Sequence, residues 1–234
     1  MDLIDRVLEF HKKWEDSGWS GMNYKAFEAL ARMFPAPCQE LYPLLIDEKT
    51  GETKLYLVKR PEDDRHYSGM WHNPGSAHRS TDSLVFGSVQ NERAFKTVPP
   101  KILENEMEKP TWVLTGREKA LHRVLASKEV GVDDGEALGV VKKDIINAGD
   151  FDLEWTPRGP ENGTLNVWLV SPDIAEGLGK SSPTETGWYD VCDLKKMSDE
   201  KMFLQHQVNR VAKALDYVRE NINPKCPQMP TMKV

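Results

Sequence analysis

Two glutamates and a histidine recur at helical spacing in the middle of the chain. Glu118, His122 and Glu129 fall in a segment from Thr115 to Val132 whose apolar residues repeat with a helical period. Because a helix turns about 100° per residue, we expect the three side chains on one face of it. Carboxylates suit Mg²⁺ or Mn²⁺, which neutralises phosphate oxygens and generates hydroxide from water. The spacing is therefore compatible with a site for a divalent metal ion.

The same residues have structural explanations. Thr115 is a good N-cap, and Glu118 lies at the position that completes a capping box with it. Gly131 is a natural stop for the helix. His122 could equally pack against its neighbours or face solvent. The structural and metal-binding roles both stay open at this point.

A loop rich in Gly, Pro, His and Ser follows in the order GMWHNPGSAHRS at 69–80. Arg60, Arg65 and Arg79 flank it, and guanidinium groups suit bidentate contact with phosphate. Solvated loop charges are the alternative for each of them. His78 is either a metal ligand or a histidine in solvent.

Two tryptophans are candidates for stacking on a planar group. Trp71 lies in this loop, and Trp155 lies in a later segment that is typical of a strand. Either ring could stack on a base, although a tryptophan beside glycine in a loop is commonly a packing anchor.

The bulk composition excludes several classes of protein. The chain has 234 residues, a net charge of -6 and 3 cysteines far apart in the sequence. The acidic balance argues against nucleic acid or an anionic membrane as partner, although a local basic pocket remains compatible with it. The cysteine pattern indicates a reducing, cytoplasmic compartment rather than a disulfide framework or a zinc site. No run of about 18 apolar residues predicts a membrane span.

The elements that must position these residues follow from periodicity and breakers. We expect an α/β protein with a helical extension over 1–37, one domain over 38–223 with an insertion at about 83–115, and a disordered tail over 224–234. Ser198 is expected to cap a final helix whose apolar stripe runs from Leu204 to Val218. The predicted strands are LYPLLID, KLYLVKR, ALGVVKKDII, DFDLEWTP and TLNVWLVS.

Four segments, taken in order, carry a family resemblance. They are LYLVKRP at 55–61, GMWHNPGS at 69–76, LASKEVGV at 125–132 and GWYDVCDL at 187–194. Their order resembles the Nudix hydrolase superfamily over roughly residues 40–197. The resemblance implies an α/β/α sandwich around a mixed sheet, in which the helix over 116–130 presents metal ligands to a diphosphate.

The metal-binding box of that family is degenerate in this chain. The family pattern R-E-U-x-E-E-x-G-U, in which U is aliphatic, can be anchored on Gly131. Val124 and Leu125 then replace the R-E pair, and Lys128 and Glu129 occupy the E-E pair. The resemblance therefore implies that Glu129 is the surviving ligand.

A narrower resemblance links the loop to isopentenyl-diphosphate isomerase, which carries W-x-N-x-x-C-x-H in the same fold. Trp71, Asn73 and His78 match that pattern, whereas Ser76 replaces the cysteine. Glu161-Asn162-Gly163 is similar to the E-N-E of the isomerase, with Gly163 in place of its catalytic glutamate. The isomerase moves protons with a thiol and a carboxylate, and both are replaced here.

Three functions remain as hypotheses. The leading one is a divergent Nudix-type hydrolase that cleaves the diphosphate bond of a nucleoside diphosphate derivative with Mg²⁺ or Mn²⁺. The alternatives are a non-catalytic Nudix-fold module that binds a nucleotide or a protein, and an isomerase-like protein. A homodimer stays open. The predicted catalytic residues are Glu129 and Glu118, the metal ligands Glu129, Glu118, His122 and His78, and the substrate-binding residues Arg60, Trp71, Asn73 and Arg79.

Overall fold

The computed structural model describes residues 36–77, 114–157 and 159–229. The helical extension predicted before residue 36 and the insertion predicted at about 83–115, except its last two residues, lie outside the described residues. The boundaries predicted for the domain stay predictions.

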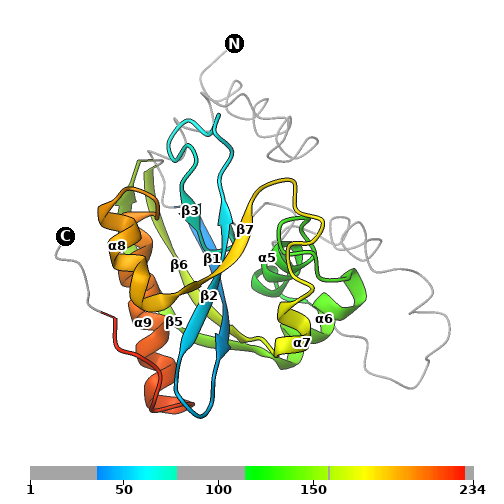
Figure 1. Cartoon of the computed structure of the whole chain (residues 1–234). Coiled ribbons are helices and arrows are strands. Elements are labelled where there is room, and N and C mark those ends of the chain that lie inside the picture. The colour runs from blue at the N-terminus through cyan, green and yellow to red at the C-terminus, as the bar shows by residue number, and fades with distance from the viewer. Residues whose placement is uncertain (1–35, 78–113, 158, 230–234) are drawn as a thin grey trace, which may run out of the picture.

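A mixed sheet forms the centre of the described part (Figure 1). Its strand order is β3-β2-β1-β6-β5, with β4 paired to β1 and β7 paired to β2. Strands β1 and β6 run parallel, and the other pairs are antiparallel. The strands are β1 (Ala36–Ile46), β2 (Thr53–Lys59), β3 (Trp71–His72), β4 (Gly75–Ala77), β5 (Ile145–Thr156), β6 (Gly159–Leu169) and β7 (Thr186–Asp190).

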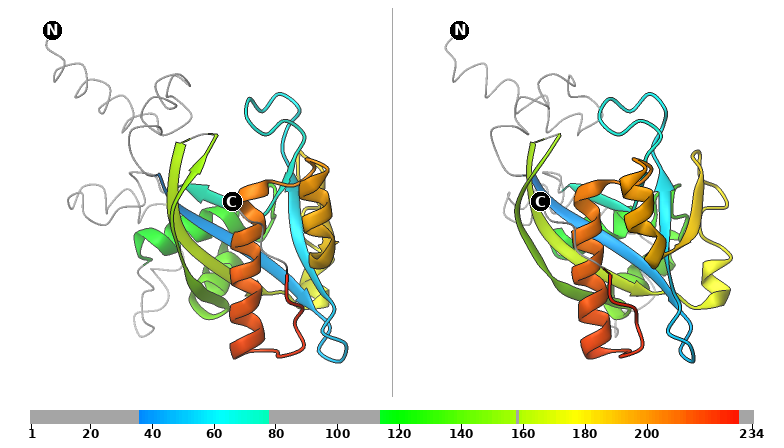
Figure 2. Two further views of the ribbon diagram at one scale, coloured as in Figure 1. Left: turned by 90° about the vertical axis from the view of Figure 1, so that its left-hand side faces the viewer. Right: turned by 60° about the vertical axis from the view of Figure 1, so that its left-hand side comes forward.

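Helices cover both faces of this sheet, as the two turned views show (Figure 2). One face packs against α8 and α9, and the other packs against α5, α6 and α7. The predicted α/β/α sandwich around a mixed sheet is thereby confirmed. The helices are α5 (Gly116–Leu125), α6 (Asp134–Lys143), α7 (Pro172–Ala175), α8 (Leu194–Asp199) and α9 (Gln205–Asn221), with a 3-10 turn at Val191–Asp193.

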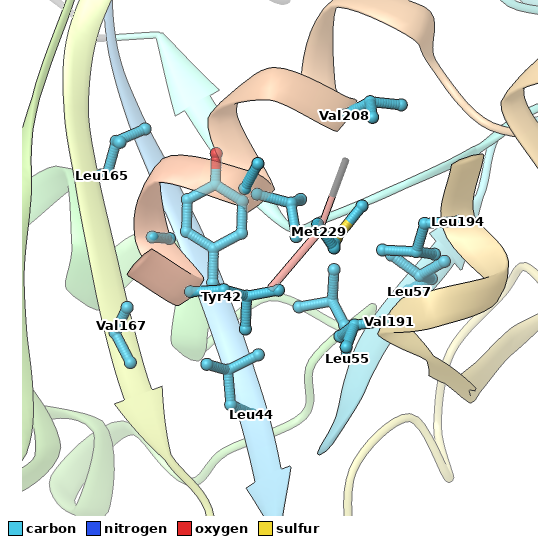
Figure 3. Close-up of a cluster of buried hydrophobic side chains, with 14 of the residues drawn as sticks. Tyr42, Leu44, Leu55, Leu57, Leu165, Val167, Val191, Leu194, Val208 and Met229 are labelled. Carbon is cyan, nitrogen blue, oxygen red and sulfur yellow. The ribbon is translucent and has the colours of Figure 1, made fainter. Parts of the chain in front are cut away.

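Alternation along β1 divides its side chains between two cores. Successive residues of a strand point to opposite faces. Tyr42 and Leu44 accordingly join the cluster under α9, whereas Leu41 joins the cluster under α5. Figure 3 shows the first cluster, in which Tyr42 and Leu44 of β1 lie between the β2 side chains Leu55 and Leu57 and the β6 side chains Leu165 and Val167. Residues of β1 with even numbers therefore face α9.

Helix α5 is shorter than the predicted span of 116–130. It ends at Leu125, with Ala126 as its C-cap. The amides of Val130 and Gly131 both bond to the Ser127 carbonyl oxygen, and Gly131 has a φ of 80°. This turn replaces the last predicted helical turn. Gly131 in the left-handed region ends a helix readily, and the Ser127 side chain can bond to nearby backbone in place of a helical hydrogen bond.

The segment ALGVVKKDII was predicted to be a strand, and this prediction is wrong for most of its residues. Residues 134–143 form helix α6, capped by the Asp133 side chain, which accepts from the Gly135 amide. Ala137, Val140 and Val141 are spaced by three and four residues and are buried against α5. Packing of this stripe overrides the strand preference of the valines. Only Ile145 and Ile146 belong to a strand, β5.

The C-terminal region differs from its prediction in two ways. Ser198 lies inside α8, and the last helix begins later, at Gln205. Its apolar stripe is confirmed, since Leu204, Val208, Val211, Leu215 and Val218 are buried.

The tail predicted to be disordered is ordered through residue 229. Cys226 and Met229 are buried in the cluster under α9. The Lys225 ammonium donates to the Lys49 carbonyl oxygen in the β1–β2 hairpin at 2.9 Å. Within the described residues, no helix combines the length and apolar character that crossing a bilayer requires.

Candidate functional site

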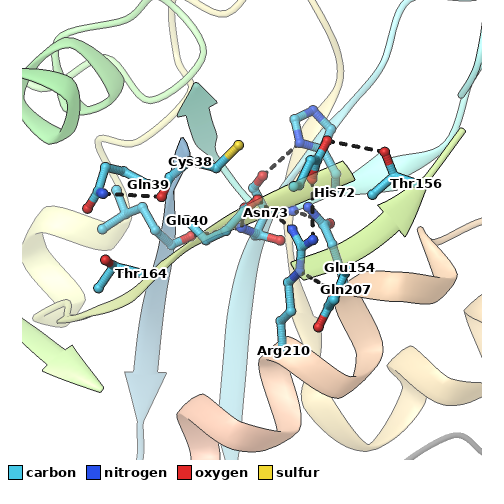
Figure 4. Close-up of polar contacts among 12 residues, drawn as sticks. Cys38, Gln39, Glu40, His72, Asn73, Glu154, Thr156, Thr164, Gln207 and Arg210 are labelled. Carbon is cyan, nitrogen blue, oxygen red and sulfur yellow. Dashed lines mark hydrogen bonds and ion pairs between the residues drawn. The ribbon is translucent and has the colours of Figure 1, made fainter. Parts of the chain in front are cut away.

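A buried arginine on α9 gathers three carboxylates from the sheet. Arg210 is 0% exposed. Its guanidinium donates to Glu154 at 2.8 Å, to Glu40 at 3.0 Å and to Glu161 at 3.3 Å. It also lies 3.8 Å from the centre of the Phe151 ring. Figure 4 shows Arg210 reaching from α9 towards Glu40 and Glu154.

Strand pairing explains why these carboxylates meet. Glu40 belongs to the even-numbered side of β1, which faces α9. In the parallel pair of β1 and β6, Ala36 lies opposite Glu161 and Glu40 lies opposite Leu165, a member of the same core cluster. Glu154 is opposite Glu161 in the β5–β6 hairpin. The three carboxylates therefore share one face of the sheet.

The charges shift the pKa values around Arg210. Burial alone would lower the pKa of Arg210, but Glu40, Tyr42, Glu154 and Glu161 together outweigh it and raise that pKa. Burial and, next, the charge of Glu40 raise the pKa of the Tyr42 hydroxyl well above its usual value. Arg210 therefore remains a cation and Tyr42 a neutral phenol at physiological pH.

Asn73 extends this network from the loop before β4. Its side chain is 0% exposed, and its amide nitrogen donates to Oε2 of the Glu40 carboxylate at 2.6 Å, while Oε1 accepts from Arg210. Its backbone amide bonds to Gln207 of α9 at 3.3 Å, and its carbonyl oxygen lies 2.7 Å from Nδ1 of His72. The side-chain oxygen of Asn73 has no hydrogen-bond partner among the described residues.

A pocket opens beside the network, between β1, the loop around β3 and β4, the start of β6 and the first turn of α9. Two of its residues are carboxylates, Glu40 and Glu161. Arg60, His72 and His206 supply groups that donate hydrogen bonds. The remaining lining residues are Cys38, Tyr67, Asn73, Gly75, Ser76, Ala77, Gly159, Pro160, Leu204 and Gln207.

The predicted substrate-binding residues do not all lie at the pocket. Arg60 and Asn73 line the pocket. Trp71 is instead a buried packing anchor, with its ring centre 4.8 Å from that of Tyr189. Trp155 is 72% exposed on β5. The predicted ligand His78 and the predicted phosphate contact Arg79 lie outside the described residues.

Glu118 has the structural role that its capping box indicates. Its carboxylate accepts from the Thr115 amide at 2.6 Å and from the Lys142 ammonium at 2.7 Å. Burial alone would raise the pKa of Glu118, but these hydrogen bonds outweigh it and lower that pKa. Both carboxylate oxygens are engaged by the protein itself.

The common helical face predicted for Glu118, His122 and Glu129 does not form. Helix α5 ends four residues before Glu129, whose carbonyl oxygen accepts from the Tyr56 hydroxyl at 2.7 Å. The Nε2 atom of His122 lies 3.0 Å from the Asp134 carbonyl oxygen. These three residues therefore do not fit a shared Mg²⁺ or Mn²⁺ ion. Nor is any other group of three His, Cys, Asp or Glu side chains in the described ranges placed to hold a metal.

The two segments that resemble the isomerase meet at the pocket, where Ser76 and Glu161 both belong to the lining. Gly163 lies opposite Cys38 in the parallel pair, and a side chain there would collide with the Cys38 carbonyl oxygen. The backbone itself therefore excludes a glutamate at position 163.

Sequence reasoning missed Glu40, His72, His206 and Arg210. One signal could have found Arg210, because Gln207, Arg210 and Ala214 continue the buried side of α9 at helical spacing. A charged residue on the apolar side of an amphipathic helix indicates a buried partner.

Comparison with known proteins gives matches among solved structures. No family model matches the chain, and no curated protein matches its sequence. The Nudix domain of NrtR from Shewanella oneidensis in complex with ADP-ribose is 14% identical, with a TM-score of 0.46 over 86% of this chain and 100% of that one. A MutT/Nudix family protein from Listeria innocua is 16% identical, with a TM-score of 0.44 over 80% and 96%.

NrtR from the same organism in complex with a 27mer DNA is 15% identical, with a TM-score of 0.46. That match covers 79% of this chain and 62% of NrtR, so the chain spans less than two thirds of that protein. At such low identities and TM-scores, these similarities establish neither an activity nor a ligand.

Proposed function

We propose that this chain is a divergent Nudix-type protein that binds a small ligand carrying a phosphate or diphosphate, with nucleoside diphosphate derivatives as the first candidates. The observation that carries the proposal is the pocket lined by Arg60, His72 and His206 beside the buried Arg210 network. A concave site with a few converging polar groups on a rigid scaffold is typical of a binding site.

The Nudix assignment is supported from within the chain. Two of the four segments that carry the resemblance, at 55–61 and 187–194, contribute β2 and β7. These strands pair directly, with Leu55 opposite Tyr189. A third segment supplies β3 and β4 together with part of the pocket. Segments distant in the sequence thus form one connected part of the sheet.

Arg60 is the best-placed contact for phosphate. Its guanidinium donates to Asp64 at 2.9 Å and lies 5.8 Å from the centre of the Tyr67 ring. These contacts fix the planar fork before a ligand arrives, which reduces the entropy lost on binding. The side chains of Arg60 and Asp64 are 23% and 17% exposed, so a phosphate there would be partly shielded from water.

Calorimetric titration of the full chain with ADP-ribose, ADP and phosphate tests this proposal. We expect Arg60→Met to weaken binding of a phosphate-bearing ligand by about tenfold, as loss of a charge-assisted hydrogen bond would. Arg65→Met is the matched control, because Arg65 is an exposed arginine of the same loop that does not line the pocket. Equal affinities for the two variants and the wild type would contradict the proposed contact.

Hydrolysis of such a ligand is the second candidate. It is favoured by Glu129, which occupies the position of a family ligand, is only partly buried and is held by Tyr56. Phosphate release from nucleotide sugars, dinucleotides and nucleoside triphosphates with Mg²⁺ or Mn²⁺ is the assay. Release by the wild type that is lost in Glu129→Gln would support a hydrolase. Ligand binding without release, unchanged in a chelator, would support a binding module.

A further inference from the structure

The carboxylates around Arg210 outnumber the positive charge that they surround. Glu40, Glu154 and Glu161 all pair with this one guanidinium. The side chains of Glu40 and Glu161 are only 9% and 13% exposed, so solvent screens them weakly. The cluster therefore keeps an excess of negative charge, and two of its three carboxylates line the pocket.

Asn73 adds an independent indication on the same wall. It lines the pocket, is fully buried, and its side-chain oxygen lacks a partner among the described residues. A buried polar atom without a partner is costly, and such atoms commonly mark a ligand contact. Like the two carboxylates, this oxygen can only accept a hydrogen bond. This wall of the pocket thus combines negative charge with acceptors.

We infer that this wall binds a positively charged, hydrogen-bond-donating group of the ligand, such as an ammonium. Arg60, the arginine that lines the pocket, is paired with Asp64. A neutral hydroxyl could satisfy the acceptors, but only a cation also offsets the charge of the cluster. The ligand would then be a phosphate or diphosphate ester that also carries an amine, with its phosphate towards Arg60. The phosphate half of this ligand rests on the proposed function, whereas the cationic half does not.

Three small probes separate the two halves. Phosphoethanolamine carries both groups. Propyl phosphate has the same shape with a methyl group in place of the ammonium, and ethanolamine carries only the ammonium. In calorimetric titrations of the full chain at low ionic strength and millimolar probe concentration, we expect phosphoethanolamine to bind about tenfold more tightly than propyl phosphate, the gain of one partly buried ion pair.

Glu161→Gln and Glu154→Gln form a matched pair of variants. Each removes one carboxylate from Arg210, but only Glu161 lines the pocket. We expect Glu161→Gln to abolish the preference for phosphoethanolamine and Glu154→Gln to keep most of it. An equal loss of this preference in both variants would contradict a contact between the ammonium and Glu161.

The outcomes distinguish this inference from the proposed function. Equal binding of phosphoethanolamine and propyl phosphate by the wild type would overturn the cationic half and leave phosphate binding intact. Binding of ethanolamine with no contribution from phosphate would support the inference and overturn the proposed function. Failure of all three probes to bind would overturn both.

Discussion

Arg210 illustrates how a single buried charge can organise a site. A guanidinium removed from water is tolerated only when its donors are matched, and here β1, β5 and β6 each supply a carboxylate. The same contacts fix Glu40, whose second oxygen holds Asn73. The wall of the pocket therefore depends on a residue that does not itself line it.

Replacement of Arg210 by methionine should reveal this dependence. Met retains much of the volume but leaves three carboxylates without their cation, and breaking a buried pair in this way costs about 3–5 kcal/mol. Arg219→Met on the same helix is the control, because its pair with Asp216 is partly exposed and contributes about 0–1 kcal/mol. Urea denaturation gives both free energies of unfolding. Similar values for the two variants would show that solvent compensates the carboxylates.

Gly163 is constrained by the backbone of the neighbouring strand. A methyl group at this position would meet the Cys38 carbonyl oxygen, whereas one at Gly139 of α6 would meet no described atom outside its own helix within 4 Å. We expect Gly163→Ala to destabilise the protein by about 2 kcal/mol through a forced strand shift. Gly139→Ala should stabilise it by about 0.5–1 kcal/mol through helix propensity. Thermal denaturation of the pair tests the parallel register, since a tolerated alanine at 163 would contradict it.

Part of the site could be predicted from the sequence and part could not. Arg60 was singled out because it flanks the loop at 69–80, and Asn73 and Ser76 because they occupy positions of the isomerase pattern. Glu40, Glu161 and Arg210 are brought together by the pairing of β1 with β6 and by the docking of α9. Such contacts between distant segments leave no local periodicity to detect.

At the scale of elements, a complete capping box was a better guide than a single capping residue such as Ser198 or than residue preference. The Thr115–Glu118 box identified the start of α5 correctly. The end of α5 and the identity of α6 were wrong, because aliphatic residues in the 134–143 region fit either a strand or a buried helical stripe. Tertiary packing on the sheet decided between the two.

Glu118 should make α5 sensitive to acid. Because its pKa is lowered in the folded protein, its contribution to stability is present above the unfolded pKa of about 4.3 and is lost as pH falls through the folded value. We expect Glu118→Gln to cost about 1 kcal/mol at neutral pH and little in acid.

A double-mutant cycle of Glu118→Gln with Lys142→Met, followed by chemical denaturation across this pH range, isolates the pair. The coupling energy should disappear in acid, where the Glu118 carboxylate is protonated. A coupling energy near zero at every pH would show that the capping hydrogen bonds, rather than the ion pair, carry the contribution of Glu118.

At the scale of the molecule, the predicted metal ligands within the described residues and the pocket lie on opposite faces of the sheet. Glu118 and His122 of α5, and Glu129 just after it, lie on one side, whereas the pocket and Arg210 lie on the side of α9. The α/β/α layering was implied by the family resemblance of the four ordered segments. Which face carries the pocket was not, because that depends on the register of β1 within the sheet.

The C-terminal tail completes the core on the α9 side, and this contribution can be measured. Met229 is 3% exposed and packs with the residues of that cluster, whereas Met202 is 42% exposed. Met229→Ala should cost about 2–3 kcal/mol, because it removes buried apolar surface and leaves a cavity, and Met202→Ala should cost well under 1 kcal/mol. Urea denaturation provides the comparison. If both substitutions were neutral, the tail would not be part of the folded core in solution, and the α9 face would be open to another occupant.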